Sequence, residues 1–197
     1  MQAKRKWRPD GKAHRMETCR LLLFDLDGTL LRSDKRITER TLQALGRCRE
    51  KGMMIGVSTS RGERIAVTFI EELRPDILIA SGGALIKHRG EYIYRAEFSP
   101  ERTRQMIGAA RSICGMDCEI TIDTVDSHYW NYRTDPKEQD RSWGDSIYTD
   151  FRDFGQSSLK MCVEIFDDSQ ARRLAELLDD CDCIRFSDGY WYKFTRK

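Results

Sequence analysis

Short apolar runs alternate with helix-type patterns over the first half of the chain. Residues 21–24 form a continuous apolar run, which is typical of a strand buried on both faces. Behind Thr38, which suits a helix N-cap, apolar residues recur at helical spacing. Strands are also expected at residues 53–57 and 77–80, with a second helix at 64–73 between them. This order of elements predicts a parallel sheet with helices on both faces.

The second half of the chain has a different pattern. Apolar segments around His88-Arg89-Gly90-Glu91 indicate a hairpin, and Ser99-Pro100 indicates a helix start, with Gly115 as its end. Further strands are expected at residues 118–123, 128–132, 159–166, 184–186 and 190–194, with a helix from Ser169 to Leu178. Residues 137–152 fit either a polar helix or a loop. We therefore expect an α+β unit with an antiparallel sheet, beginning near residues 83–90.

Composition narrows the class of protein. Of the 197 residues, 40% are hydrophobic and 34% are charged, which is typical of a water-soluble globular protein. No apolar run approaches the ~20 residues of a membrane span, and no secretory signal is visible. A cytoplasmic protein that binds neither membrane nor nucleic acid is expected. The 7 cysteines lack zinc-site spacing, so we expect reduced thiols, mostly buried.

The charge is concentrated at the N-terminus. The net charge is +2, but the first fifteen residues carry six basic residues and one acidic residue. The remainder is therefore mildly acidic. We expect residues 1–18 to be a disordered leader. The alternative is a basic arm for nucleic acid or a membrane surface.

Two carboxylates follow the first expected strand, in Asp25-Leu26-Asp27-Gly28-Thr29. Side chains at i and i+2 of an extended chain point to the same side, and parallel sheets bind ligands at the carboxyl ends of their strands. A hard cation such as Mg²⁺ would relieve the repulsion between Asp25 and Asp27, and Gly28 allows close approach of a ligand. The pattern indicates metal-assisted phosphate chemistry. An ordinary turn after a strand is the alternative.

A second polar segment, Ser58-Thr59-Ser60-Arg61, follows the second expected strand. Thr59, Ser60 and the backbone N–H groups entering the next helix suit a phosphate, and Arg61 suits a phosphate or carboxylate. A simple helix cap is the alternative. The position of both segments at neighbouring strand ends favours a binding site.

These segments resemble the haloacid dehalogenase (HAD) superfamily of phosphohydrolases. Residues 25–29 match its DxDGT motif, and Thr59 matches its second motif, although Ser60 stands where the family often has Gly. Residues 81–86 and the second-half pattern resemble the Cof-type subfamily. The resemblance implies a three-layer, Rossmann-like parallel-sheet core with an α+β cap. It assigns residues 19–86 to the core, 87–188 to the cap, and 189–197 to a strand returning to the core.

The resemblance also implies a mechanism. Asp25 would be the nucleophile that forms an aspartyl-phosphate, and Asp27 the general acid and base. Mg²⁺ would be held by the Asp25 carboxylate and the Asp27 carbonyl, and Thr59, Ser60, Arg61 and Gly28 would bind phosphate. The substrate would be a small phosphorylated metabolite, such as a sugar phosphate or a phosphorylated cofactor.

Two family motifs, a lysine and a final acidic pair, have no match in the sequence. We expect the chain to stop before them, with the core incomplete and its activity far below that of a complete protein. Lys193 is interpreted as an exposed strand lysine rather than as the motif lysine. The alternatives are a non-catalytic HAD-like fragment and a phosphomutase of the same superfamily. Trp130, Trp191 and their aromatic neighbours are expected to pack in a core.

Overall fold

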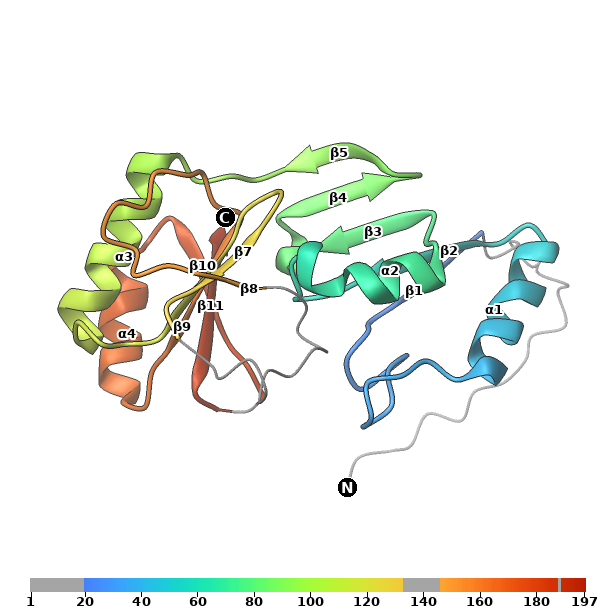
Figure 1. The fold of residues 1–197 in the computed structure, drawn as a ribbon, viewed down its shortest axis with the longest axis horizontal. Helices are drawn as coiled ribbons and strands as arrows, with labels where there is room; N and C mark the ends of the chain where they lie inside the picture. The colour runs from blue at the N-terminus through green and yellow to red at the C-terminus, as the bar shows by residue number, and fades with distance from the viewer. Residues whose placement is uncertain (1–19, 133–145, 188) are drawn as a thin grey trace, which may run out of the picture.

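The structure is a computed structural model that describes residues 20–132, 146–187 and 189–197. Its strands form two sheets, and the chain passes from one to the other once (Figure 1). Each sheet has its own cluster of buried apolar side chains. The expected leader and residues 137–145 lie outside the described residues.

The first sheet has five strands in sequence order. The strands are β1 (Leu21–Phe24), β2 (Met54–Ser58), β3 (Ile77–Ala80), β4 (Leu85–His88) and β5 (Glu91–Arg95). The first three pair in parallel, which confirms the predicted parallel sheet, while β4 and β5 add antiparallel strands. The expected hairpin therefore extends the first sheet. The sheet ends after β5 rather than at the expected boundary of residue 86.

The helical elements of this half follow their local signals. They are α1 (Glu39–Glu50), the 3-10 turn η1 (Arg64–Ala66), α2 (Val67–Leu73) and the 3-10 turn η2 (Ser81–Gly83). Thr38 caps α1 as predicted, because its hydroxyl accepts a hydrogen bond from the Thr41 N–H. The helix expected at 64–73 begins as a 3-10 turn. It ends where Arg74 adopts a φ of 46°, since Pro75 disfavours a right-handed helical residue before it.

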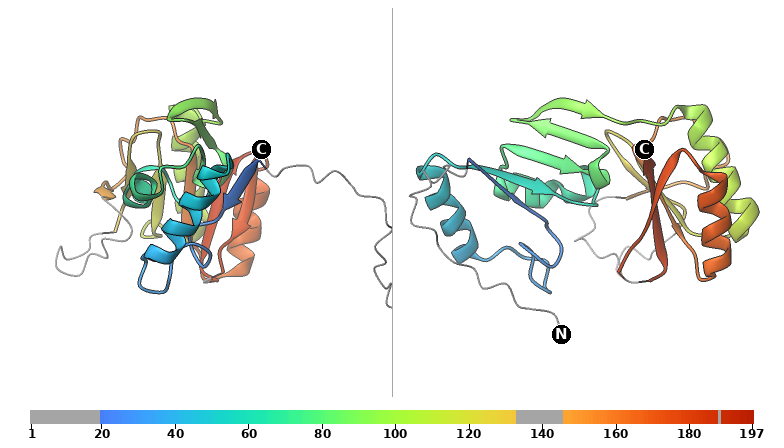
Figure 2. Two further views of the ribbon diagram at one scale, coloured as in Figure 1. Left: turned by 90° about the vertical axis from the view of Figure 1, so that its right-hand side faces the viewer. Right: turned by 180° about the vertical axis from the view of Figure 1, so that it is seen from behind.

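The second sheet has six strands in the order β10-β11-β9-β6-β7-β8. Its elements are α3 (Pro100–Cys114), β6 (Ile120–Asp123), β7 (His128–Trp130), β8 (Ser146–Tyr148), β9 (Lys160–Glu164), α4 (Asp168–Leu177), β10 (Cys181–Arg185) and β11 (Trp191–Arg196). The helices α3 and α4 lie side by side on one face (Figures 1 and 2). The expected α+β unit is therefore confirmed, and its sheet is antiparallel except where β7 and β8 pair in parallel.

Three expectations for this half are wrong in detail. Residues 191–196 do not return to the first sheet, because β11 pairs with β9 and β10. Asp167 rather than Ser169 caps α4, since its carboxylate accepts the Ser169 N–H. The strand β8 was not expected, because residues 146–148 lie in a stretch that favoured no single structure.

The central strands of the second sheet alternate strictly between two kinds of side chain. On the helix-covered face, the alternating residues Ile120, Ile122, Met161, Val163, Tyr192 and Phe194 belong to the apolar cluster. The opposite face carries the residues between them, and we call it the polar face: Thr121, Asp123, Lys160, Cys162, Lys193 and Thr195. Each of these six residues is buried as well. The polar face is therefore covered by something other than the helices.

The cysteines are less buried than the sequence predicts. Among the described residues, six cysteines are free thiols, but only Cys162 and Cys181 are buried and the other four are half-buried. Among the described residues, no helix is both long enough and apolar enough to cross a membrane.

Candidate active site

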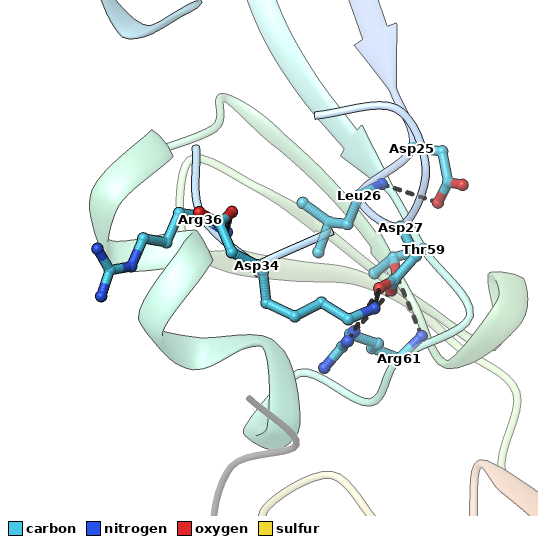
Figure 3. A network of polar contacts seen from close by, with 8 residues as sticks. Asp25, Leu26, Asp27, Asp34, Arg36, Thr59 and Arg61 are labelled. Carbon is cyan, nitrogen blue, oxygen red and sulfur yellow. Dashed lines mark hydrogen bonds and ion pairs between the residues drawn. The ribbon is translucent and has the colours of Figure 1, made fainter. Parts of the chain in front are cut away.

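The loop after β1 holds its two carboxylates apart from one another. Leu26 is fully buried between them, and its carbonyl accepts the N–H groups of Leu30 and Leu31. Gly28 has a φ of 77°, which closes the turn in a conformation that glycine adopts without steric cost. Asp25 and Asp27 therefore emerge on either side of an anchored leucine at the carboxyl end of β1 (Figure 3).

Asp27 is held by two cations. The Arg61 Nε lies 2.7 Å from its Oδ2, and the Arg61 Nη2 and Lys35 Nζ lie 2.9 Å and 2.8 Å from its Oδ1. The hydrogen bond from Arg61, reinforced by Lys35, lowers the pKa of Asp27 to about 2 against the opposing effect of burial. We call Asp27, Arg61 and Lys35 the open cluster, because the Asp27 side chain remains 36% exposed. Its carboxylate is ionised at neutral pH.

Asp25 has a different environment. It is exposed, and its Oδ1 accepts the N–H of Leu26 at 2.8 Å. Its carboxylate points away from the ion pairs of Asp27 (Figure 3). An exposed carboxylate oxygen at the end of a parallel strand can approach a ligand without first breaking an ion pair.

The loop after β2 brings the second predicted segment beside the first. Thr59 is buried, and its Oγ1 accepts the Arg61 N–H at 3.1 Å. Arg61 is 3% exposed, and its guanidinium turns toward Asp27 rather than toward open solvent. The structure thus brings Thr59, Arg61 and Asp27 together, as adjacency of the strand ends predicts. Ser60 takes part through its backbone carbonyl, which accepts a hydrogen bond from the Lys160 ammonium.

That contact belongs to a second group of charges, which we call the interior cluster: Asp123, Lys160, His128 and Ser81. Lys160 Nζ lies 2.7 Å from Asp123 Oδ2 and donates to the Ser60 carbonyl at 2.7 Å. His128 Nδ1 lies 2.6 Å from Asp123 Oδ1, and the Ser81 hydroxyl donates to Oδ2 at 3.1 Å. All four residues are less than a tenth exposed. The cluster fastens the polar face to the loop after β2.

Burial and charge act in opposite directions inside the interior cluster. Burial alone would raise the pKa of Asp123, but the nearby Lys160 and the hydrogen bond with His128 hold it well below its ordinary value. Burial opposes the charge of Lys160, and Asp123 nevertheless raises the pKa of that lysine. Both groups are therefore charged at neutral pH. Their mutual attraction compensates for the loss of water.

Sequence reasoning missed most of these partners. Lys35 lies in a turn with a φ of 56°, and no motif marks it. His128 was expected at the start of a strand. It lies in a strand, but it is buried against Asp123. The sequence shows that Asp123 and Lys160 alternate with apolar residues, as Thr121 and Cys162 do, and so lie on one face of their strands. It does not show that this face is covered.

The candidate metal ligands fit Mg²⁺ only as an incomplete set. Among the described residues, no group of three or more His, Cys, Asp or Glu side chains could hold a metal ion. The Asp27 carboxylate is taken up by Arg61 and Lys35. The Asp25 carboxylate and the Asp27 backbone carbonyl are the oxygen ligands left at this position. They suit a hard cation that keeps several waters and shares substrate phosphate oxygens.

The family model and the similar proteins all belong to hydrolases or phosphatases. The profile of the haloacid dehalogenase-like hydrolases matches residues 22–193. An HMP-PP phosphatase of Klebsiella pneumoniae is 34% identical over 90 residues, which cover 45% of this chain and 33% of that protein. A 5-amino-6-(5-phospho-D-ribitylamino)uracil phosphatase of Bacillus subtilis is 26% identical over 116 residues, or 57% of this chain and 42% of that protein. The matches thus span less than half the length of these two relatives.

Solved structures share the fold. A haloacid dehalogenase-like hydrolase from Bacteroides thetaiotaomicron superposes with a TM-score of 0.73 at 20% identity, covering 91% of this chain and 71% of that one. A protein from Thermotoga maritima superposes with a TM-score of 0.70 at 17% identity, covering 91% and 70%. At these identities the likeness concerns the fold alone.

Proposed function

The chain belongs to the haloacid dehalogenase-like hydrolases, and from this premise we propose that it hydrolyses small phosphomonoesters through a phosphorylated Asp25. The observation that carries the proposal is the meeting of two strand ends. The exposed Asp25 follows β1, and in the same loop Asp27 pairs with Arg61, which follows β2 together with Thr59. Phosphoryl transfer depends on positioning and charge stabilisation, and these groups supply both.

Asp25 is the better nucleophile of the two carboxylates. It is exposed and forms no ion pair with any residue that the structure describes, whereas the Asp27 oxygens face Arg61 and Lys35. An Asp25 oxygen attacks phosphorus, the bond from phosphorus to the ester oxygen breaks, and the leaving alkoxide takes a proton. Water then attacks the phosphoryl group, the bond to Asp25 breaks, and inorganic phosphate is released.

Asp27 moves the protons in this scheme. As an ionised carboxylate it can accept a proton from the attacking water. A phosphate dianion competes with Asp27 for Arg61 and Lys35. When those cations turn toward the substrate, the pKa of Asp27 rises and the group can carry the proton that the leaving oxygen needs. The same two cations thereby serve the free and the substrate-bound states.

Thr59, Ser60, Arg61 and Gly28 make up the phosphate side of the proposal. The Thr59 hydroxyl is already a partner of the Arg61 N–H, so the loop is held in one shape before substrate arrives. Mg²⁺ held by the Asp25 carboxylate and the Asp27 carbonyl would supply charge neutralisation at the phosphoryl oxygens.

Small phosphorylated metabolites are the proposed substrates. This follows the names of the two relatives, which are phosphatases of HMP-PP and of a phosphoribitylamino-uracil. The proposal includes neither nucleic acid nor a membrane surface as a partner.

The test is hydrolysis of p-nitrophenyl phosphate by the purified chain in the presence of Mg²⁺. Asp25→Asn keeps the shape of the side chain and removes the nucleophile, so we expect turnover to fall by about a thousandfold or more. The matched control is Asp34→Asn, which changes an exposed aspartate of the same loop. Its partners among the described residues are Arg32 and the Arg36 N–H. Unchanged turnover in Asp25→Asn would contradict the proposed nucleophile.

A further inference from the structure

Lys193 lies on the polar face, and its ammonium has no ion-pair partner among the described residues. The residue is 6% exposed, which overturns the expectation of an exposed strand lysine. Among the described residues, no acceptor lies within hydrogen-bond or ion-pair distance of its Nζ. A buried ammonium without a partner is costly, because it loses water and gains nothing in return.

The neighbouring charges are already committed. Asp123 bonds Lys160, His128 and Ser81, and Asp27 bonds Arg61 and Lys35. Asp182 on β10 acts on Lys193 only through space. Burial first, and then the positive charge of Lys160, lower the pKa of Lys193. Lys193 is therefore the cation on this face whose charge the described residues do not balance.

The ammonium lies next to the candidate phosphate loop. A methyl group placed on Gly82 would lie 2.6 Å from Lys193 Nζ and 3.0 Å from its Cδ, so the lysine runs closely over this glycine. The Gly82 N–H in turn donates to the Thr59 carbonyl at 3.1 Å. The Lys193 side chain thus crosses from the second sheet to the turn that holds Thr59.

The ammonium also keeps a route to solvent. Of the side-chain nitrogens and oxygens in the part of the chain that the structure describes, Arg111 Nε is the one that is both sealed from water and without a hydrogen bond. Lys193 Nζ has no hydrogen bond either, so it is not sealed. Part of the ammonium surface therefore remains in contact with solvent.

We propose that Lys193 binds a second anionic group of the substrate, a phosphoryl or carboxylate group beyond the phosphate that is cleaved. The inference rests on the proposed function for the identity of the first phosphate. The site for the second anion is made by the Lys193 ammonium over the Gly82 turn. It would favour diphosphates and phosphorylated acids over esters with a neutral leaving group.

The test compares the binding of three anions by calorimetry. Inorganic pyrophosphate and phosphonoacetate carry a second phosphoryl and a carboxylate group respectively, and orthophosphate carries neither. In Lys193→Met we expect the affinity for the first two to fall by about tenfold, the effect of losing one charge-assisted hydrogen bond. Orthophosphate affinity should stay within about twofold of that of the unchanged chain. A loss for one two-group anion alone identifies which second group the site takes.

Stability provides an independent measurement. Methionine fills a similar volume without a buried charge, so Lys193→Met should raise the melting temperature by about 2–4 °C. A residue that costs stability and supports anion binding has a binding role. Lys193→Gln provides a second variant with a neutral polar side chain, and Lys51→Gln is the control that removes an exposed lysine at the end of α1.

Three results would overturn the inference: binding of neither pyrophosphate nor phosphonoacetate by the unchanged chain, equal losses for all three anions, or no loss in Lys193→Met. A melting temperature that falls in both Lys193 variants would also contradict it. Hydrolysis by Asp25→Asn bears only on the proposed function. The binding difference requires no turnover, so the two proposals fail separately.

Discussion

The open cluster and the interior cluster use the same chemistry in opposite surroundings. Each has one aspartate held by two nitrogen-bearing side chains at distances of 2.6–2.9 Å. The Asp27 side chain is 36% exposed, whereas that of Asp123 is 1% exposed. The Asp27 pairs can therefore exchange with solvent or a ligand, while the Asp123 pairs cannot change without opening the contact between the two sheets.

Burial assigns the two clusters different tasks. Water screens the open cluster, so its ion pairs contribute little to stability and can be rearranged cheaply. The interior cluster is expensive to form and more expensive to break, because a lone charge would remain inside the protein. The first suits a reacting group, and the second suits a fixed joint beneath the loop that carries Thr59 and Arg61.

The largest expected effect comes from removing one partner of the interior cluster. Lys160→Met leaves Asp123 buried without its ion pair and should lower the free energy of unfolding by about 3–5 kcal/mol. Urea denaturation followed by circular dichroism measures this. Adding Asp123→Leu in the same chain removes the stranded charge and should recover most of the loss. No loss in Lys160→Met would remove the contrast between the clusters.

Gly62 tests how closely the interior cluster fits its loop. A methyl group at Gly62 would lie 2.7 Å from the Asp123 Cγ and Oδ2 atoms. Gly62→Ala should therefore destabilise the protein by about 1–3 kcal/mol through overpacking. Gly46→Ala is the matched control, since nothing lies within 4 Å of that position and alanine favours the helix α1 by up to about 1 kcal/mol. Equal changes in stability at Gly62 and Gly46 would show that Asp123 does not pack tightly against the loop.

The smallest effect is expected at the open cluster. Lys35→Gln should change the free energy of unfolding by less than about 1 kcal/mol, because the pair is screened by water. The pKa of Asp27, about 2 in the unchanged chain, should rise but stay below its ordinary value, since Arg61 remains. A carboxyl-carbon NMR titration measures both values.

The loss of stability in acid has the same sign for the two clusters and differs between them in size. A carboxylate with a lowered pKa stabilises the folded state above its ordinary pKa, near 3.8, and the stabilisation is lost as the pH falls toward the folded value. Both aspartates follow this rule. The acid-sensitive part of the unfolding free energy should shrink more in the Lys160→Met, Asp123→Leu chain than in Lys35→Gln.

The parallel strands and the first motif were predictable because each depends on neighbours in sequence. The run Leu21–Phe24 is apolar enough to identify a strand, although the expected burial on both faces is wrong, because its residues alternate between exposed and half-buried. Thr38 and Ser99 cap helices by local hydrogen bonds. Adjacent parallel strands also place their carboxyl ends together, so the meeting of Asp27 with Arg61 follows from topology.

The other contacts depend on which surface covers the polar face. The registers that place Asp123 opposite Lys160 and Cys162 opposite Lys193 are long-range pairings. Trp130 and Trp191 were expected in a core, but they are half-buried and stack edge to face, 6.4 Å apart, outside both apolar clusters. Alternation could show that a strand has two faces, but not that both would be buried.

The alternation along β11 also bears on how this protein could diversify. Tyr192 and Phe194 pack in the apolar cluster, and Lys193 and Thr195 lie between them on the opposite face. Under the proposed role of Lys193, substitutions at the second pair would change which leaving group is accepted, while the first pair preserves folding. Neighbouring positions in one strand thus meet separate physical demands, one set by the ligand and the other by the apolar cluster.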